Sequence, residues 1–208
     1  YKISLYVFGL ISLFGVILGR FVCGFLCPFG LIQDLLFKIP FVKKVRKLKG
    51  EKFLRGIRFL ILAVFVIILP MFIIDITGLG KPWFCKYICP VGTLEGGMPL
   101  VLMNESLRSA IGFLFKWKVA ILIAILFFSI IIYRPFCRYI CPLGAIYGFF
   151  NKISFVRYRV DKSKCTKCGL CQKKCELNIN VYENPNSIDC IRCGKCMESC
   201  PVKAIKMG

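Results

Sequence analysis

Three long apolar runs organise the first part of the chain. Residues 3–19 carry no charge, residues 57–76 carry charges only near their two ends, and residues 117–133 are charge-free after Lys118. A helix needs about 20 predominantly apolar residues to cross a bilayer. The pattern therefore predicts three membrane-spanning helices, with a kink or break at Pro70. The alternative for each run is a buried helix of a soluble protein.

Two further segments have mixed patterns. Residues 91–115 are moderately apolar but are interrupted by glycines, a proline and a polar stretch. This predicts a re-entrant or interfacial helical segment, with a fourth span as the alternative. Residues 29–39 predict an amphipathic helix on the inner membrane surface, with Gln33, Asp34 and Lys38 on its polar side.

Composition supports a membrane protein and gives its orientation. The chain is 58% hydrophobic yet has a net charge of +20. Apolar runs with basic flanks are typical of membrane spans, and no nucleic-acid recognition element is present, so no nucleic-acid partner is expected. Residues 38–58 hold nine basic residues and one acidic residue, whereas residues 78–116 hold four basic residues. The positive-inside rule predicts a multi-pass protein of a prokaryotic inner membrane, with its C-terminal part in the cytoplasm.

The strongest chemical signal is a pair of cysteine runs near the C-terminus. CTKCGLCQKKC begins at Cys165 and CIRCGKCMESCP begins at Cys190, and both have the C-x2-C-x2-C-x3-C spacing of bacterial two-cluster ferredoxins. Histidine is absent, so a His-based haem or zinc site is excluded. Glu176 replaces the proline that usually follows the fourth cysteine. A pair of structural zinc sites is the alternative.

In the ferredoxin arrangement the fourth cysteine of each run binds the other cluster. The first predicted [4Fe–4S] cluster therefore has the ligands Cys165, Cys168, Cys171 and Cys200. The second has the ligands Cys190, Cys193, Cys196 and Cys175. The predicted fold is mostly α, with a helical membrane domain over residues 1–156 and a small α+β two-cluster ferredoxin domain over residues 157–208.

A second cysteine pattern, Cys-x3-Cys-Pro, occurs three times in the helical part. The three pairs are Cys23/Cys27, Cys85/Cys89 and Cys137/Cys141. Proline after the second cysteine favours the first turn of a helix, where the helix dipole stabilises a thiolate. Charge distribution places the first and third pairs on the cytoplasmic side, where their four thiolates would bind a further iron–sulfur cluster through iron.

The middle pair falls on the opposite side in this topology, with two ligands only. Another protomer would complete a shared cluster at a dimer interface, or another subunit would supply the missing ligands. Cysteines four apart at a helix start also lie within disulfide range, so Cys85 and Cys89 suit a redox dithiol. A fourth alternative is that broken spans let all six cysteines converge.

Together the motifs CGFLCPFG, CKYICPVG, CRYICPLG and the two C-terminal runs resemble the membrane-bound polyferredoxins of the NapH/NosR type. The resemblance covers essentially the whole chain. It implies electron transfer between a cytoplasmic donor and a membrane or extracytoplasmic acceptor. The typical member has two Cys-Pro motifs, so the middle pair here has no counterpart from which a role can be transferred.

Three functions fit the sequence. The first is an electron conduit from a cytoplasmic ferredoxin or flavoprotein, through the clusters, to a membrane or extracytoplasmic acceptor such as a flavin-carrying protein. The second is a reductant relay to extracytoplasmic thiols through Cys85/Cys89, and the third is a membrane-anchored redox sensor or assembly factor. In each case the chain is a component of an oxidoreductase system, not a stand-alone enzyme, and it contacts the lipid bilayer as a homodimer or complex subunit.

Overall fold

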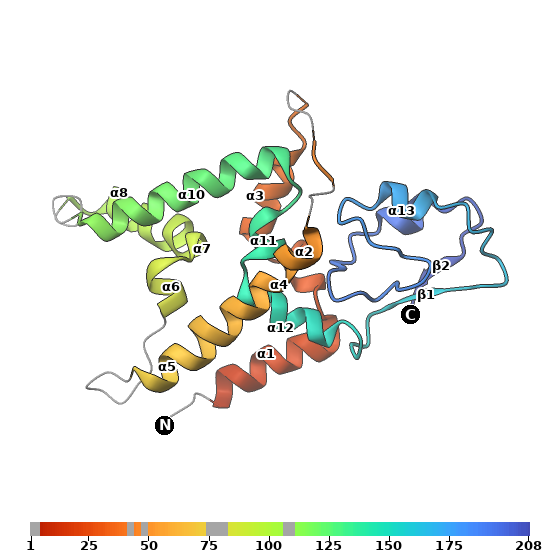
Figure 1. The fold of residues 1–208 in the computed structure, drawn as a ribbon, viewed down its shortest axis with the longest axis horizontal. Coiled ribbons are helices and arrows are strands. Elements are labelled where there is room, and N and C mark those ends of the chain that lie inside the picture. Colours follow the sequence, from red (N-terminus) through yellow and green to blue (C-terminus); the bar gives the residue numbers. More distant parts are fainter. Residues whose placement is uncertain (1–4, 41–43, 47–49, 74–82, 106–110) are drawn as a thin grey trace.

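The computed structural model describes residues 5–40, 44–46, 50–73, 83–105 and 111–208, and this part of the chain is mostly helical (Figure 1). The two strands are β1 (Tyr158–Val160) and β2 (Ile205–Met207). The helical elements, including two π-helices labelled η, are α1 (Leu5–Leu18), α2 (Phe21–Phe25), α3 (Pro28–Phe37), α4 (Glu51–Ile61), η1 (Leu62–Ile68), α5 (Leu69–Phe72), α6 (Trp83–Tyr87), α7 (Pro90–Gly92), η2 (Thr93–Gly97), α8 (Met98–Met103), α10 (Phe113–Ile131), α11 (Pro135–Tyr139), α12 (Pro142–Phe150), α13 (Leu170–Lys174) and α14 (Lys195–Glu198).

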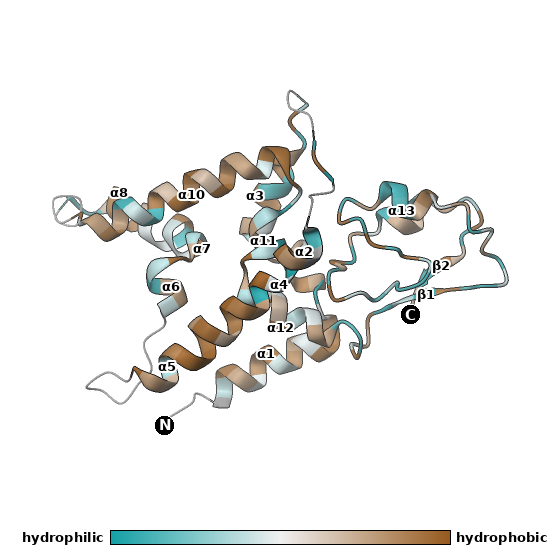
Figure 2. Cartoon of the chain, in the orientation of Figure 1, coloured by the Kyte–Doolittle hydropathy of each residue, from teal (hydrophilic) through white to brown (hydrophobic). Residues whose placement is uncertain are grey.

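Two of the described helices are long and apolar enough to cross a membrane. They are Phe53–Phe72, which joins α4, η1 and α5, and Phe113–Ile131, which is α10. Figure 2 shows hydrophobic colouring along most of both. The predicted first span is represented by α1, which is described over 14 residues and is too short to count as a span. The prediction of three spans is therefore corrected to two over the described residues.

The helix does not break at Pro70 itself, because it continues through this residue and ends two residues later at Phe72. Proline removes one backbone hydrogen bond and crowds the preceding turn. The π-helical turns of η1 lie immediately before Pro70. Wider turns of this kind relieve such crowding, so the span accommodates the proline without ending. Residues 74–76, the end of the predicted run, lie outside the described residues.

The segment between the two spans forms a short helical stretch over residues 90–103, made of α7, η2 and α8. Both α7 and η2 pack against α10. This stretch is too short to cross a bilayer, so the described residues agree with a re-entrant or interfacial segment and not with a fourth span.

Helix α3 departs from the predicted surface helix at Gln33 and at its leucines. Its polar residue Gln33 is completely buried, together with Phe29 and Phe37, while Leu31 and Leu35 are exposed. Helix α3 packs along α10 through this buried face. The predicted polar side is therefore confirmed only in part: Gln33 lies inside the protein, whereas Lys38 is exposed as predicted.

The C-terminal part lies at one end of the molecule, beside α2, α11 and α12 (Figure 1). Strands β1 and β2 pair antiparallel, with Tyr158 opposite Met207, and close a small unit around α13 and α14. A hydrophobic core joins this unit to the helical part. Its buried residues are Phe37, Tyr133, Leu177, Ile179 and Ile191.

Glycine permits this close packing at α12. A Cβ atom added to Gly148 would lie 2.8 Å from the carbonyl oxygen of Ile188, closer than real Cβ contacts. Gly9 in α1 has open space around it and provides a matched control. We expect Gly148→Ala to lower the free energy of unfolding by about 1–3 kcal/mol through overpacking.

In contrast, Gly9→Ala should be neutral or stabilise the helix by up to about 1 kcal/mol. Thermal unfolding of both variants in the same detergent measures the difference. Equal unfolding temperatures would contradict the close contact between Gly148 and Ile188.

Candidate metal centres

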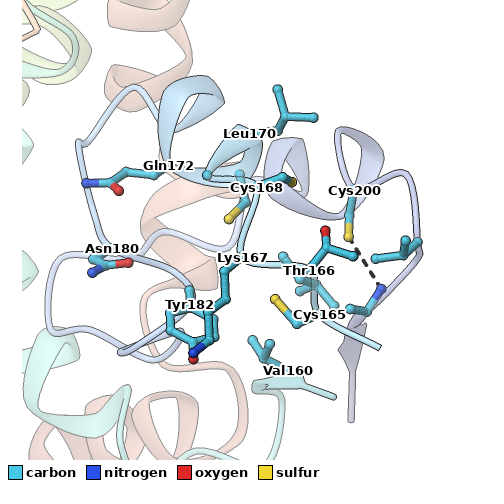
Figure 3. A pocket seen from close by; sticks show the side chains of 15 residues that line it. Val160, Cys165, Thr166, Lys167, Cys168, Leu170, Gln172, Asn180, Tyr182 and Cys200 are labelled. Atoms are coloured by element: carbon cyan, nitrogen blue, oxygen red, sulfur yellow. Dashed lines mark hydrogen bonds between the residues drawn. The ribbon is translucent and has the colours of Figure 1, made fainter. Parts of the chain in front are cut away.

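The four cysteines predicted to bind the first C-terminal cluster surround one cavity. Its volume is about 200 Å³, and its lining includes Cys165, Cys168, Cys171 and Cys200. Figure 3 shows the side chains of Cys165, Cys168 and Cys200 around this cavity. Cys200 comes from the second run, so the geometry matches the exchange of the fourth ligand that the spacing predicts. The donor set and the cavity fit a [4Fe–4S] cluster.

The two cysteine runs also have matching backbone conformations. Positive φ angles occur two residues after the first cysteine, one residue after the second and three residues after the fourth in both runs. The corresponding pairs are Lys167 and Arg192, Gly169 and Gly194, and Asn178 and Lys203. Repeated positive φ angles turn the backbone tightly in both loops. The C-terminal unit is therefore an internal duplication with two equivalent cysteine loops.

The second C-terminal set lies on the side nearest the helical part. Three of its cysteines pack against the hydrophobic side chains around Phe37 and Tyr133, namely Cys175, Cys190 and Cys193. Burial raises the pKa of the Cys190 thiol to about 11. A bound metal supplies the positive charge that a buried thiolate needs, so the buried Cys190 fits an iron–sulfur site better than a free thiol.

Each Cys-Pro motif has the predicted local geometry. Cys27, Cys89 and Cys141 stand at the N-caps of α3, α7 and α12, and the following proline occupies the start of each helix. The sequence prediction of a helix beginning directly after the second cysteine is confirmed at all three places. Each of these sulfurs therefore lies at the positive end of a helix, although α7 is very short.

The first and third pairs are neighbours in space. Burial raises the pKa of the Cys137 thiol, Arg134 opposes this shift, and Cys27 and Cys23 are near enough to raise the pKa further. Cys141 is likewise influenced by Cys137 and Cys23, after burial, which is the main cause of its raised pKa. The structure thus brings the four cysteines together from α2, α3, α11 and α12.

Buried arginines surround this group of cysteines. Arg20 and Arg134 are both 2% exposed. Arg20 donates to the carbonyl oxygen of Cys137 at 2.9 Å, and Arg134 donates to that of Cys23 at 2.6 Å. The Nε atom of Arg20 is buried without a hydrogen-bond partner. Asp189 pairs with Arg20 and Asp34 pairs with Arg134, and a thiolate-ligated iron–sulfur cluster would add further negative charge beside these buried cations. The site fits such a cluster.

The middle pair does not stand apart from the others. Cys89 packs against the same hydrophobic cluster as Cys27, Cys137 and Cys141, through Phe84 and neighbouring residues. The pair is therefore not isolated from the others in the structure, whereas its side of the membrane stays a prediction. The short helices after Cys89 pack against α10 and bring this pair alongside it. Of the four alternatives, convergence of the cysteine pairs agrees best with the described residues.

Cys85 and Cys89 also interact directly. A hydrogen bond between the two side chains raises the pKa of Cys85 and lowers that of Cys89. The backbone N–H groups of Gly92 and Val91 further lower the pKa of Cys89, against the effect of burial. The helix start thus favours a thiolate at Cys89, as the sequence predicted.

Asp189 joins the helical part to the second cysteine run. It forms ion pairs with Arg58 at 2.7 Å, with Arg20 at 3.7 Å and with Arg55. Burial alone would raise the pKa of the Asp189 carboxyl, but the charges of Arg58, Arg55 and Arg20 outweigh it and hold the pKa below its ordinary value. One buried carboxylate therefore pairs with cations from α4 and from the segment before α2, and Glu51 pairs with Arg55 as well.

Glu176, which replaces the usual proline, has a structural role. Its carboxylate pairs with Arg46 of the basic loop at 3.3 Å and with Lys195 at 3.6 Å. A proline here could make neither contact. The departure from the ferredoxin pattern thus connects Cys175 and its neighbours to the helical part.

Within the described residues no group of three or more Cys, Asp or Glu side chains is close enough to share one metal ion. In a [4Fe–4S] cluster each cysteine binds a different iron, so the ligands stand farther apart than those of a single ion. The arrangement gives the zinc alternative no support. Sequence reasoning missed Arg20, Arg134 and Asp189, although charged residues beside apolar runs are a recognised signal of buried functional sites.

Comparison with known proteins identifies the chemistry of these sites. The model of a 4Fe-4S binding domain family matches residues 3–49, 60–98 and 117–160, and each matched segment contains one Cys-Pro motif. A second 4Fe-4S binding domain model matches residues 186–206. No solved structure matches the chain.

Similar proteins occur in archaea and bacteria. The chain is 30% identical to the uncharacterized protein MJ0750 of Methanocaldococcus jannaschii over 81% of its own length and 63% of the relative. It is 28% identical to the putative electron transport protein YccM of Escherichia coli over 80% of the chain and 44% of the relative. It is 28% identical to the ferredoxin-type protein NapH of Haemophilus influenzae over 80% of the chain and 51% of the relative.

The chain therefore spans less than two thirds of each of these relatives. The first family model alone covers more than half of the chain, and its matches include all three Cys-Pro motifs. The cysteine spacing, the geometry of the sites and these matches agree with one another. The chain belongs to the NapH/NosR-type family of 4Fe-4S binding proteins and carries 4Fe–4S clusters.

Proposed function

We propose that this iron–sulfur electron-transfer protein passes electrons from its C-terminal clusters to a third cluster held by Cys23, Cys27, Cys137 and Cys141. The observation that carries the proposal is the contact made by Arg20. Its guanidinium donates at 2.9 Å both to the carbonyl oxygen of Cys137 and to that of Ile188, two residues before Cys190. This side chain connects the backbones of two proposed ligand loops.

A second connection supports the same order of clusters. Asn151 donates to the carbonyl oxygen of Cys190 at 2.6 Å and accepts from the backbone N–H of Arg20 at 3.0 Å. Electrons would enter at the cluster of Cys165, Cys168, Cys171 and Cys200, which is farther from the helical part. They would then pass through the cluster of Cys190, Cys193, Cys196 and Cys175 to the helical site. This assignment makes residues 157–208 a two-cluster ferredoxin domain.

The proposal places the helical part, residues 1–156, in a prokaryotic cell membrane. Helices Phe53–Phe72 and Phe113–Ile131 have few buried residues, as expected for lipid-facing spans and not for core helices of a soluble protein. The basic loop over residues 38–58 favours a cytoplasmic ferredoxin domain. Outward electron movement is then favoured by roughly 2.3 kcal/mol per 100 mV of inside-negative potential.

The proposed partners follow from this orientation. A reduced cytoplasmic ferredoxin or flavoprotein would donate electrons to the exposed cluster near Cys168. The acceptor would be a membrane or extracytoplasmic protein, such as a flavin-carrying subunit. The chain would thus act as one component of a larger oxidoreductase.

Iron determination and EPR of the purified full chain test the third cluster. Three [4Fe–4S] clusters correspond to about twelve iron atoms per chain, and two correspond to about eight. We expect about twelve, with three reducible EPR signals. A value of eight or fewer in fully loaded ferredoxin sites would refute the helical cluster.

A second candidate function is a thiol relay through Cys85 and Cys89. The direct contact between these side chains favours it. In such a relay the dithiol would become a disulfide, releasing two electrons and two protons to an acceptor disulfide. Thiol trapping in intact cells distinguishes the candidates: a mixed disulfide at Cys89 supports the relay, whereas persistent protection with bound iron opposes it.

A further inference from the structure

Gln33 is a polar residue in the helical core that no ligand motif includes. Its side chain is completely buried on α3. The Nε2 atom lies 3.5 Å from the sulfur of Cys137, a hydrogen-bonding distance for sulfur, and 3.4 Å from the carbonyl oxygen of Phe29. Both neighbours are acceptors, so the amide nitrogen must face them.

The position of Gln33 relates it to both cysteine pairs. Helix α3 begins at Cys27, a proposed ligand, and Gln33 on the same helix reaches Cys137 in the other pair. The Oε1 atom of Gln33 is buried without a hydrogen-bond partner. Burying an amide with one end unsatisfied costs free energy. The contact to sulfur gives a reason for a glutamine here, because a leucine would fill the same core without that cost.

We propose that Gln33 raises the reduction potential of the helical iron–sulfur cluster by donating a hydrogen bond to the Cys137 thiolate. Hydrogen bonds to ligand sulfurs are among the factors that set cluster potentials. Reduction adds one electron and makes the sulfurs more negative, so the hydrogen bond stabilises the reduced form more than the oxidised form. Gln33 does not bind the cluster itself and acts only through its hydrogen bond to Cys137. This role rests on the proposed helical cluster.

Gln33→Met tests the role, because methionine has similar length and volume but no N–H donor. We expect iron content to stay at the wild-type level while the helical cluster becomes harder to reduce. A tenfold lower ratio of reduced to oxidised cluster at a fixed potential corresponds to about 59 mV for one electron. EPR-monitored redox titration measures this ratio. Resonance Raman spectroscopy should show an altered Fe–S stretch of the same cluster.

Ser129→Ala is the matched control. Ser129 is also completely buried in the helical core, but its hydroxyl donates to Ile125 of its own helix. We expect the helical cluster of Ser129→Ala to keep its wild-type reduction potential. Both C-terminal clusters should keep theirs in either variant. An unchanged helical-cluster potential in Gln33→Met, or an equal shift in Ser129→Ala, would overturn the role of Gln33 while leaving the proposed conduit intact.

Iron content separates the remaining outcomes. Loss of iron from Gln33→Met alone would show a structural role and overturn potential tuning. A wild-type chain that holds only about eight iron atoms would refute the helical cluster itself, and the role of Gln33 with it.

Discussion

Asp189→Asn is expected to weaken the attachment of the C-terminal unit to the helical part by about 3–5 kcal/mol, the range for removing one partner of a buried ion pair. The effect is large because Arg20, Arg55 and Arg58 all pair with this carboxylate. Asparagine keeps the size of the side chain but leaves buried positive charge without its counterion. Reduction of the helical cluster by electrons entering at the C-terminal unit should slow in parallel.

Stopped-flow reduction, thermal unfolding and iron analysis test this prediction together. Glu183→Gln removes an acidic residue from the exposed surface of the same unit and serves as the control. We expect Asp189→Asn to unfold at a lower temperature and to reduce its helical cluster more slowly, while the C-terminal clusters keep their iron. A variant with wild-type unfolding and reduction rates would show that the three ion pairs contribute little.

The second large effect is expected on iron content when a cysteine of the Cys-Pro motifs is replaced. Cys137→Ser should remove the helical cluster and lower iron content by about four atoms per chain, because one of its four proposed ligands is lost. Cys89→Ser should keep this iron if the middle pair is a dithiol or an exit site. The two substitutions are chemically identical and lie in equivalent motifs, so each controls for the other.

Iron analysis and EPR of both variants read the result directly. Equal iron loss from Cys137→Ser and Cys89→Ser would show that the middle pair also binds iron, either in the same cluster or in another. Retention of all iron in Cys137→Ser would contradict the proposed ligand set. Both C-terminal signals should persist in each variant and confirm that the chain has folded.

Local features of this fold were predictable from sequence because their causes are local. Proline after the second cysteine of each motif specifies a helix start, and Cys27, Cys89 and Cys141 stand there. The spacing of the C-terminal runs indicated that Cys165 and Cys200 share a site, and both line one cavity. Hydropathy located both long spans to within a few residues at the ends that the structure describes.

Features that depend on the surroundings or on distant partners were not predictable. The pattern of α3 does not reveal whether the Gln33 side chain meets water or protein, and this side chain lies inside. The contact between Arg20 and Asp189 joins residues far apart in sequence, which no local pattern encodes. The packing of Cys89 beside the other cysteine pairs was not predictable, because it depends on short helices that pack against α10.

The duplicated loops of the C-terminal unit are equivalent in backbone but not in use. At matching positions, Arg192 is buried and donates to Leu18 and Ser154 of the helical part, whereas Lys167 is exposed and lies over the ring of Tyr182. The loop that contains Arg192 is packed against the helical part, whereas the loop that contains Lys167 faces solvent. The unit therefore has a fixed polarity: in the proposed two-cluster arrangement, a soluble carrier would meet the solvent-facing loop, whose Cys168 is exposed.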